Sequence, residues 1–359
     1  MELMPIDRID DWEQRLARQD AFWSCEIIDR PVVCCGLGKE NPDYARPAAK
    51  EWPTIRDRWM DTEHIVESAL AGAMNTEYLG DALPGFSPNL GPEVFSAMFG
   101  AEMEYGERTS WSIPNLIDWA DADKLQFSKD NFYFRKLVEI TDALLEAGKG
   151  KFYVGTTDWH AGGDCIAAFR DPLNLNIDMI EHVGEVKALL RRVTDAYFEV
   201  FDFFHDKLSA AGQASTCWAG LVSSKKWYVP SNDFSCMVSK EMFDDVFLPG
   251  IIEECRHMEA NIYHLDGPQA LQHLDSLLEI PELNAIQWVF GAGNGRCSDW
   301  MHVYKRCQAA GKGLQLGLGL DELDFFMENL RPEGLYVGLG GIKDRDHYDA
   351  VIKKISTWI

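Results

Sequence analysis

The sequence predicts one α/β domain of the (β/α)8 barrel class, with an N-terminal extension. Seven short apolar segments, near residues 31, 152, 215, 261, 285, 313 and 335, have the composition and periodicity of strands. Segments with helical periodicity separate most of them, as in parallel sheets whose strands are joined by crossover helices. No repeat or linker divides the 359 residues, and this length suits one barrel with insertions.

The elements follow in order along the chain. Residues 1–60 form the expected extension and first strand, with a helix over 11–22 and the strand at 31–35, and a further helix is expected over 52–74. The eighth strand is expected within 70–85, around 77–79. Residues 77–128 carry four prolines and several glycines, which predicts an irregular, lid-like excursion with one short helix at 93–98. The remaining helices are expected at 131–147, in two pieces over 176–211, from 239 onward, and at 298–310, 322–330 and 344–358.

Composition and charge exclude several classes of protein. No apolar run approaches the ~20 residues that span a bilayer, and the N-terminus lacks the pattern of a signal peptide. The net charge of -24 repels polyanions, which excludes nucleic acid as a partner. Nine scattered cysteines without a CxxC pair are typical of reduced thiols, so we expect a cytoplasmic protein. The Trp and Phe content leaves room for a homodimer.

The strongest candidate site lies within residues 261–295, where a strand ends in His264-Leu265-Asp266-Gly267. Two residues apart on a strand, His264 and Asp266 would point to one face. An imidazole and a carboxylate on one face can form part of a metal site or an acid/base pair. The alternative is that Asp266 caps the following helix while His264 packs with one hydrogen bond. The Gly/Asn loop after the next strand adds Asn294 as a substrate contact.

A second candidate repeats the same spacing at another strand end. Asp158 and His160 follow the strand that begins near residue 151, with Asp164 close by. Gly162 and Gly163 would let the backbone approach a ligand. The expected substrate contacts are polar or aromatic residues of neighbouring loops, for which the alternatives are plain packing or a solvated carboxylate: Trp218, Tyr228, Asp233 and Asp81.

The order of these motifs resembles the uroporphyrinogen decarboxylase superfamily over roughly residues 75–358. The resemblance rests on four segments: residues 232–249 with Asn-Asp-Phe-Ser at the start and Leu-Pro at the end, 263–267, 285–288 before the Gly/Asn loop, and 310–312 before a strand. It implies a (β/α)8 barrel of that type, with its pocket at the carboxyl ends of the strands.

Two activities are implied by this resemblance. The decarboxylases hold a polycarboxylate with a basic motif of the kind R-Q-A-G-R-Y, whereas residues 31–40 here contain no arginine pair. A uroporphyrinogen decarboxylase-like activity is therefore the alternative. The other branch comprises methyltransferases that use corrinoid proteins, whose thiol-using members hold zinc on an H-x-C pair and a later G-C-G cysteine. Here His264 matches, Asp266 replaces the first cysteine and Leu339 the second.

We therefore expect a methyltransferase that moves a methyl group between a small methylated compound and a corrinoid (cobalamin) protein, which would dock at the barrel mouth. The residues expected to be catalytic are His264, Asp266, Asp158 and His160. His264 and Asp266 could hold zinc, with a third ligand from Asp158, His160 or Asp233. Without a metal they would act as acid/base groups. A barrel that only binds a small ligand, without catalysis, is the remaining alternative.

Overall fold

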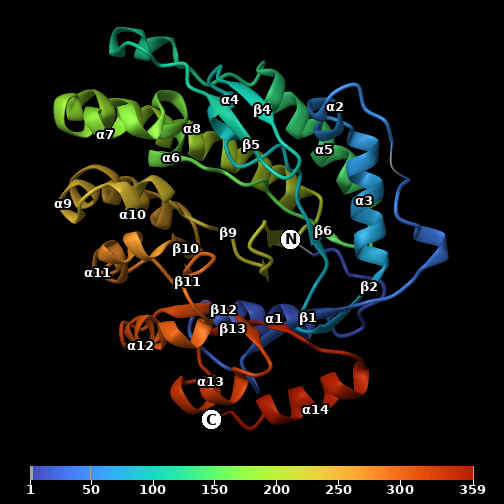
Figure 1. The fold of residues 1–359 in the computed structure, drawn as a ribbon. Coiled ribbons are helices and arrows are strands. Elements are labelled where there is room, and N and C mark those ends of the chain that lie inside the picture. The colour runs from blue at the N-terminus through green and yellow to red at the C-terminus, as the bar shows by residue number, and fades with distance from the viewer. Residues whose placement is uncertain (1–2, 49, 359) are drawn as a thin grey trace.

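The computed structural model describes residues 3–48 and 50–358, and its strands and helices alternate along most of the chain (Figure 1). The strands are β1 (Val32–Gly38), β2 (Thr76–Gly80), β3 (Gly85–Phe86), β4 (Glu102–Tyr105), β5 (Ser110–Ile113), β6 (Tyr153–Val154), β7 (Ser215–Thr216), β8 (Val222–Ser223), β9 (Trp227–Tyr228), β10 (Ala260–Asp266), β11 (Ala285–Val289), β12 (Gly313–Gly319) and β13 (Leu335–Gly340). The α-helices are α1 (Trp12–Phe22), α2 (Ile55–Trp59), α3 (Thr62–Met74), α4 (Val94–Ala97), α5 (Phe132–Ala147), α6 (Gly162–Arg170), α7 (Pro172–Glu181), α8 (Val183–Ala210), α9 (Lys240–Met242), α10 (Leu248–His257), α11 (Leu274–Leu278), α12 (Met301–Ala309), α13 (Leu323–Asn329) and α14 (Arg345–Ile355).

The central sheet is mostly parallel, in the order β2-β1-β13-β12-β11-β10-β9. Only the β1–β2 pair within it is antiparallel. Strands β3 and β6 form a separate parallel pair, and β4–β5 and β7–β8 are antiparallel pairs. In the described residues the ladder therefore ends at β2 on one side and at β9 on the other. The fold is α/β with crossover helices, as the alternating pattern predicted.

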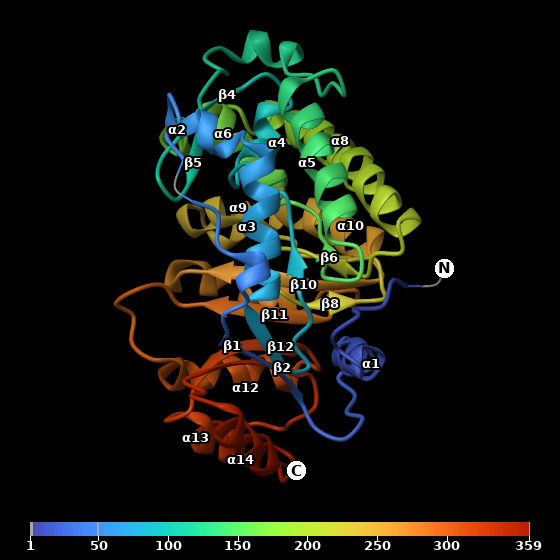
Figure 2. The same ribbon diagram turned by 90° about the vertical axis from the view of Figure 1, so that its right-hand side faces the viewer.

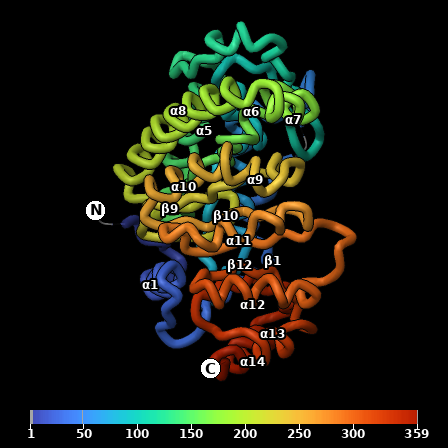
Figure 3. The backbone as a smooth tube through the Cα atoms, turned by 90° about the vertical axis from the view of Figure 1, so that its left-hand side faces the viewer, coloured from blue at the N-terminus to red at the C-terminus, as the bar shows by residue number. Residues whose placement is uncertain are grey.

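Helices pack beside the sheet. Figure 3 shows α8, α10, α11 and α12 following one another down one side of the molecule. In α8, Leu189, Val193, Val200 and Phe204 lie at helical spacing and are buried in the main core, as their periodicity predicted. On another side α3 and α5 pack against each other (Figure 2). None of the helices in the described part of the chain has both the length and the apolar character needed to cross a bilayer.

Three expectations need correction. The strand around residues 77–79 exists as β2, but it runs antiparallel to β1, and the strand that pairs in parallel with β6 is the short β3. The helix expected over 52–74 is two helices, because Asp61 caps the start of α3 through its bond from His64 N, 2.9 Å. The excursion at 77–128 is more ordered than its glycines and prolines suggested, since it contains the β4–β5 hairpin, which packs on α4 and α6.

Asp81 lies in a buried ionic cluster at the amino end of β1. Its side chain is 0% exposed and accepts hydrogen bonds from Arg18 (3.1 Å), from Arg30 (2.9 Å for the Nη2–Oδ1 contact) and from Val33 N (2.9 Å). The cluster joins α1 to the start of the sheet. Because β1 and β10 run in the same direction in the sheet, Asp81 lies at the opposite end from the carboxyl ends of the strands.

Replacement of Asp81 by alanine should leave Arg18 and Arg30 buried without their partner. Removing one member of a buried ion pair costs about 3–5 kcal/mol, and we expect a loss of this size in the free energy of unfolding, measured by denaturant titration. Asp123→Ala is the control, because Asp123 is 92% exposed in its pair with Arg192 and should cost less than about 1 kcal/mol. Equal losses in the two variants would contradict a structural role for Asp81.

Candidate functional site

Polar side chains from three segments meet at the carboxyl ends of β6 and β10. Two sets of three potential ligand atoms each lie within 4.8 Å of one another: His160, Asp164 and Asp233 in one set, and Asp233, His264 and Asp266 in the other. Asp233 belongs to both. We call these five residues together with Asp158 the aspartate–histidine cluster. Of the predicted residues, Asp158, His160, Asp233, His264 and Asp266 are thus brought together, although they are far apart in the sequence.

A row of side-chain amides holds the ring of His264. The parallel register places His264, Gln287 and Gln315 side by side on β10, β11 and β12. Gln315 Nε2 donates to the backbone oxygen of Ala219 at 2.7 Å, and Gln287 Nε2 donates to Gln315 Oε1 at 2.7 Å. Gln287 therefore presents Oε1 to His264 Nδ1, which must carry the proton and donate. The other ring nitrogen, Nε2, has no hydrogen-bond partner within the described residues, so in the neutral ring it offers a lone pair to a ligand.

The segment before the 3-10 helix η3 (Asp233–Met237) runs beside β10. His264 N donates to Pro230 O at 3.1 Å, and this contact brings Asp233 next to the end of the strand. Oxygen Oδ1 of Asp233 is buried and has no hydrogen-bond partner. Burial, followed by the negative charge of Asp233, raises the pKa of Asp266, while the charge of His264 acts in the opposite direction.

His160 faces the cluster from the segment after β6. Its backbone N donates to Pro92 O at 3.4 Å, so the excursion that contains Pro92 helps to hold it. Its Nε2 lies 3.5 Å from Asp158 Oδ2. Burial lowers the pKa of His160, but the hydrogen bond and charge of Asp158, with the charges of Asp164 and Asp233, outweigh burial and raise the pKa to about 9.

Asp164 lies in the first turn of α6 and accepts hydrogen bonds from the backbone N–H groups of Asp233 (3.0 Å) and Phe234 (2.8 Å). Burial, and then the charge of Asp233, raise the pKa of Asp164. Within residues 3–48 and 50–358, no lysine or arginine forms an ion pair with the four aspartates of the cluster. The cluster therefore concentrates negative charge, which the proton on His160 offsets in part.

Two glycines allow this close approach. Gly162 has a φ of +57°, which favours glycine at the start of α6. A Cβ on Gly163 would lie only 2.7 Å from Asn232 Oδ1. Asn232 itself is 3% exposed, and neither of its amide atoms has a hydrogen-bond partner.

The predicted substrate contacts have different environments. Trp218 is 40% exposed and lies edge-to-face against His264, with 5.2 Å between ring centroids, so it borders the cluster. Tyr228 is buried, and its hydroxyl donates to Thr157 O at 2.8 Å and accepts from Trp159 N at 2.7 Å, so it positions the segment of Asp158. Asn294 is exposed and donates to Phe290 O within its own loop. Asp81 lies at the far end of the sheet.

Sequence reasoning assigned no role to four residues that lie in or beside the cluster. Asp164 had been noted only as a neighbour, and Gln287 and Gln315 were not singled out, although each is the one polar residue in its otherwise apolar strand. A single polar residue in an apolar strand could have indicated these two glutamines as candidates. Cys236 had no signal in its spacing. Burial raises the pKa of its thiol, and the charges of Asp233, Asp164 and Asp266 raise it further.

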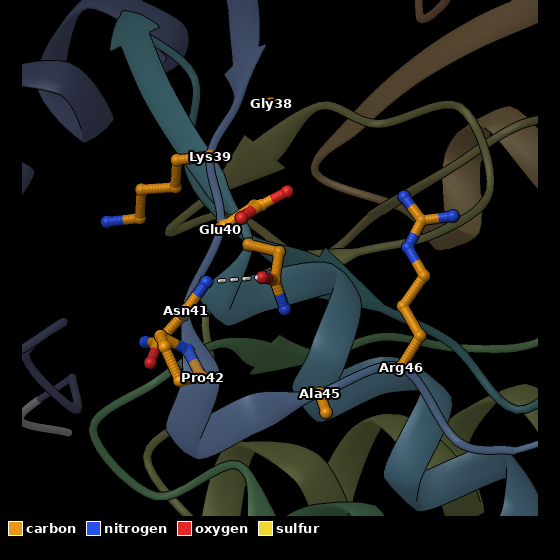
Figure 4. Close-up of a pocket in the computed structure, with 8 residues that line it drawn as sticks. Gly38, Lys39, Glu40, Asn41, Pro42, Ala45 and Arg46 are labelled. Atoms are coloured by element: carbon orange, nitrogen blue, oxygen red, sulfur yellow. Dashed lines mark hydrogen bonds between the residues drawn. The ribbon is translucent and has the colours of Figure 1, made fainter.

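A pocket of about 660 Å³ lies elsewhere, at the carboxyl end of β1 (Figure 4). Lys39, Glu40 and Arg46 line it, and Asn75 Oδ1 accepts a hydrogen bond from Asn41 N at 2.7 Å. None of the side chains of the aspartate–histidine cluster lines this pocket. The chemistry-bearing residues and this cavity are therefore separate features of the molecule.

No family model and no curated protein sequence matches this chain. Among solved structures, a methyltransferase from Methanosarcina mazei has a similar fold, with a TM-score of 0.57. The two are 13% identical, and the alignment covers 95% of this chain and 98% of the other. At this low sequence identity the comparison shows a similar fold and nothing further.

Glu254 of α10 provides a pH test of the packing behind the cluster. Burial, with smaller contributions from the charges of Asp164 and Glu253, raises its pKa from 4.5 to about 8. From pH 4.5 to 8 the unfolded chain releases a proton that the folded protein keeps, so Glu254 lowers the stability as the pH rises through this range.

Replacement of Glu254 by glutamine removes this ionisation. We compare the free energy of unfolding of the variant with that of the wild type by denaturant titration at about pH 4 and at about pH 9. The difference, variant minus wild type, should be larger at about pH 9 by more than about 1.4 kcal/mol. Glu253→Gln is the matched control, since the exposed Glu253 pairs with Arg191 at the surface. If the difference in free energy of unfolding is the same at both pH values, Glu254 is not held protonated in the folded protein.

Proposed function

We propose that this protein is a methyltransferase that moves a methyl group between a small methylated compound and a corrinoid carried by a separate protein. The observation that carries the proposal is the convergence of His264, Asp266 and Asp233 at the carboxyl end of β10, with His264 Nε2 free. The motif order of the sequence and the fold similarity to a protein named as a methyltransferase support it.

The barrel predicted from the sequence is part of this proposal. Several contacts extend the order of strands beyond β9 to β7, β6 and β3, and we propose that this series closes into a (β/α)8 barrel of the uroporphyrinogen decarboxylase type. Gly155 N, directly after β6, donates to Phe86 O in β3 at 2.9 Å, and Thr156 N donates to Thr216 O in β7 at 3.0 Å. Trp227 Nε1 then donates to Ser215 O at 2.9 Å, linking β7 to β9. In this arrangement the cluster lies at the end where barrel enzymes carry their active sites.

We further propose that His264, Asp233 and Asp266 hold a divalent cation such as zinc. Three observations support this fit: the free lone pair on His264, the unpartnered oxygen of Asp233 and the raised pKa of Asp266. Nitrogen and oxygen donors with one position left for a substrate are typical of catalytic zinc sites. When bound, the cation would polarise the oxygen or nitrogen of the methylated compound and stabilise the negative charge that develops there.

Residues in and beside the cluster would bind and orient the methylated compound. Trp218 presents an exposed ring beside His264 and would contact the methylated compound. Asp158 holds the ring of His160, which carries a proton at neutral pH when no cation displaces it. Leu339, where thiol-methylating relatives have a cysteine, is buried on β13. Activation of an oxygen or nitrogen centre therefore fits this chain better than binding of a thiolate.

An apolar surface near the cluster supports docking of a protein partner. Leu173, Ile177 and Ile180 of α7 are exposed at 71%, 46% and 74%, at the spacing of one helix face. Met237, at the end of η3, is also exposed, and Asn176 Nδ2 lies 3.9 Å from its sulfur. The helix η3 connects this face to the cluster, because it begins at Asp233 and ends at Met237. A corrinoid protein bound there would lie beside the reacting methyl group.

The alternatives fit the cluster less well. A uroporphyrinogen-like polycarboxylate would have to approach four aspartates that have no lysine or arginine partner in the described part of the chain, in a protein of net charge -24. A module that only binds a ligand would not need His264 to present a free nitrogen.

The proposal is tested with the purified protein, a reduced corrinoid protein and a panel of methylated oxygen and nitrogen compounds. Methyl transfer should occur with at least one compound, followed by the absorbance of the corrinoid, and His264→Gln and Asp266→Asn should lower its rate roughly 100-fold or more. His302→Gln, at an exposed histidine of α12, should keep the wild-type rate. If no compound serves as a donor, the methyltransferase proposal fails. If a compound binds equally well to all variants without turnover, the protein is a binding module.

The amide row predicts a positioning role for Gln287. Gln287→Leu removes the acceptor that fixes the proton on His264 Nδ1, and we expect a 10- to 100-fold weaker affinity for zinc, measured by competition with a chelator. Gln287→Glu should restore most of the affinity, because a carboxylate also accepts from Nδ1. An unchanged affinity in Gln287→Leu would rule out this role.

A further inference from the structure

We propose that His160, Asp164 and Asp233 form a second divalent cation site, so that the cluster binds a pair of cations bridged by Asp233. The potential ligand atoms of this set lie within 4.8 Å of one another, as do those of the set that contains His264. Asp233 is the one residue common to both. A carboxylate has two oxygens and can bridge two cations about 3.5–4 Å apart, a common arrangement in paired metal sites.

The charge balance favours two cations over one. Asp158, Asp164, Asp233 and Asp266 supply four carboxylates, and no lysine or arginine within residues 3–48 and 50–358 pairs with them. One divalent cation would offset half of this charge. A second would offset the rest.

Unpartnered polar atoms beside the second set point to a missing ligand. Asn232 is 3% exposed, and both atoms of its amide lack a hydrogen-bond partner, which costs free energy in a buried site. Both amide atoms lie within 3.0 Å of the point that a Cβ on Gly163, the residue before Asp164, would occupy, and the next residue in the chain is Asp233. An amide oxygen in this position can join carboxylates around a cation.

The two histidines have equivalent support. A metal-binding histidine usually directs its second ring nitrogen to a carboxylate, an amide or a carbonyl. His264 has Gln287 in this role, and His160 has Asp158. The donors are one imidazole and several oxygens on each side, which suits Zn²⁺, Mn²⁺, Fe²⁺ or Co²⁺.

This second site extends the proposed function, since its Asp233 is also a ligand of the cation proposed there. Its test does not depend on methyl transfer. The metal-free full-length protein is titrated with Mn²⁺, and bound metal is counted after removal of the excess. Electron paramagnetic resonance then distinguishes isolated Mn²⁺ ions from a coupled pair.

We expect about two Mn²⁺ ions per chain in the wild type, with the spectrum of a coupled pair. His160→Gln and His264→Gln should each retain about one ion, with the six-line spectrum of isolated Mn²⁺. Asp233→Asn should abolish the coupling and lower the affinity for both ions. Matched controls at exposed positions, His302→Gln and Asp123→Asn, should keep the coupled pair, and circular dichroism checks that each variant is folded.

The other results overturn the proposal in different ways. One ion in the wild type that is lost in His264→Gln but kept in His160→Gln excludes the second site and leaves the single cation of the proposed function. Two ions without coupling exclude the bridge through Asp233. No bound ion in the wild type excludes both cation sites, whatever the outcome of the methyl-transfer assay.

Discussion

The register between parallel strands is the constraint on which the site depends. A shift of one residue between β10 and β11 would turn Gln287 away from His264 and break the row of amides that ends at the oxygen of Ala219. The backbone ladder thus determines which nitrogen of His264 carries the proton. The strand register, which is set by backbone hydrogen bonds along the whole sheet, therefore also sets the tautomer of one side chain, His264.

The cluster also works against stability. Negatively charged carboxylates are held close together at the ends of β6 and β10, where they repel one another, and Glu254 is buried behind them. The apolar core beneath the strands and the buried pairing of Asp81 with Arg18 and Arg30 offset this cost at other places in the fold. Such concentration of strain in a small region is typical of functional sites, where binding of a ligand relieves it.

Much of the fold was predictable because it depends on local patterns. Long helices such as α5 and α8, and strands such as β10 and β12, have a clear period or a continuous apolar run. The short strands β3, β6 and β7 have only two residues each, and their pairing is set by tertiary contacts that no local pattern records. The direction of β2 was missed for the same reason, because periodicity does not distinguish parallel from antiparallel pairing.

The residues of the candidate site could be predicted in part, but their contacts with one another could not. The repeated two-residue spacing identified Asp158, His160, His264 and Asp266, since polar residues at strand ends stand out from apolar strands. The shared position of Asp233 depends on how the segment before η3 lies along β10, and the role of Asp164 depends on the backbone of η3. Both depend on contacts between segments that are far apart in the sequence. Tyr228 shows the opposite case, because its aromatic ring suggested a ligand contact while its buried hydroxyl supports the backbone.

The pairing of β1 with β13 has a consequence for the synthesis of the protein. Val32 pairs with Tyr336, so β1 can pair with β13 only after the more than 300 residues between them have left the ribosome. Until then the edge of β1 that faces β13 has free backbone donors and acceptors, which other chains can bind. Pairing over such long sequence separations is slow. The nascent chain would therefore depend on its early contacts, such as those of α1 and β2 with β1, and on chaperones to keep that edge from aggregation.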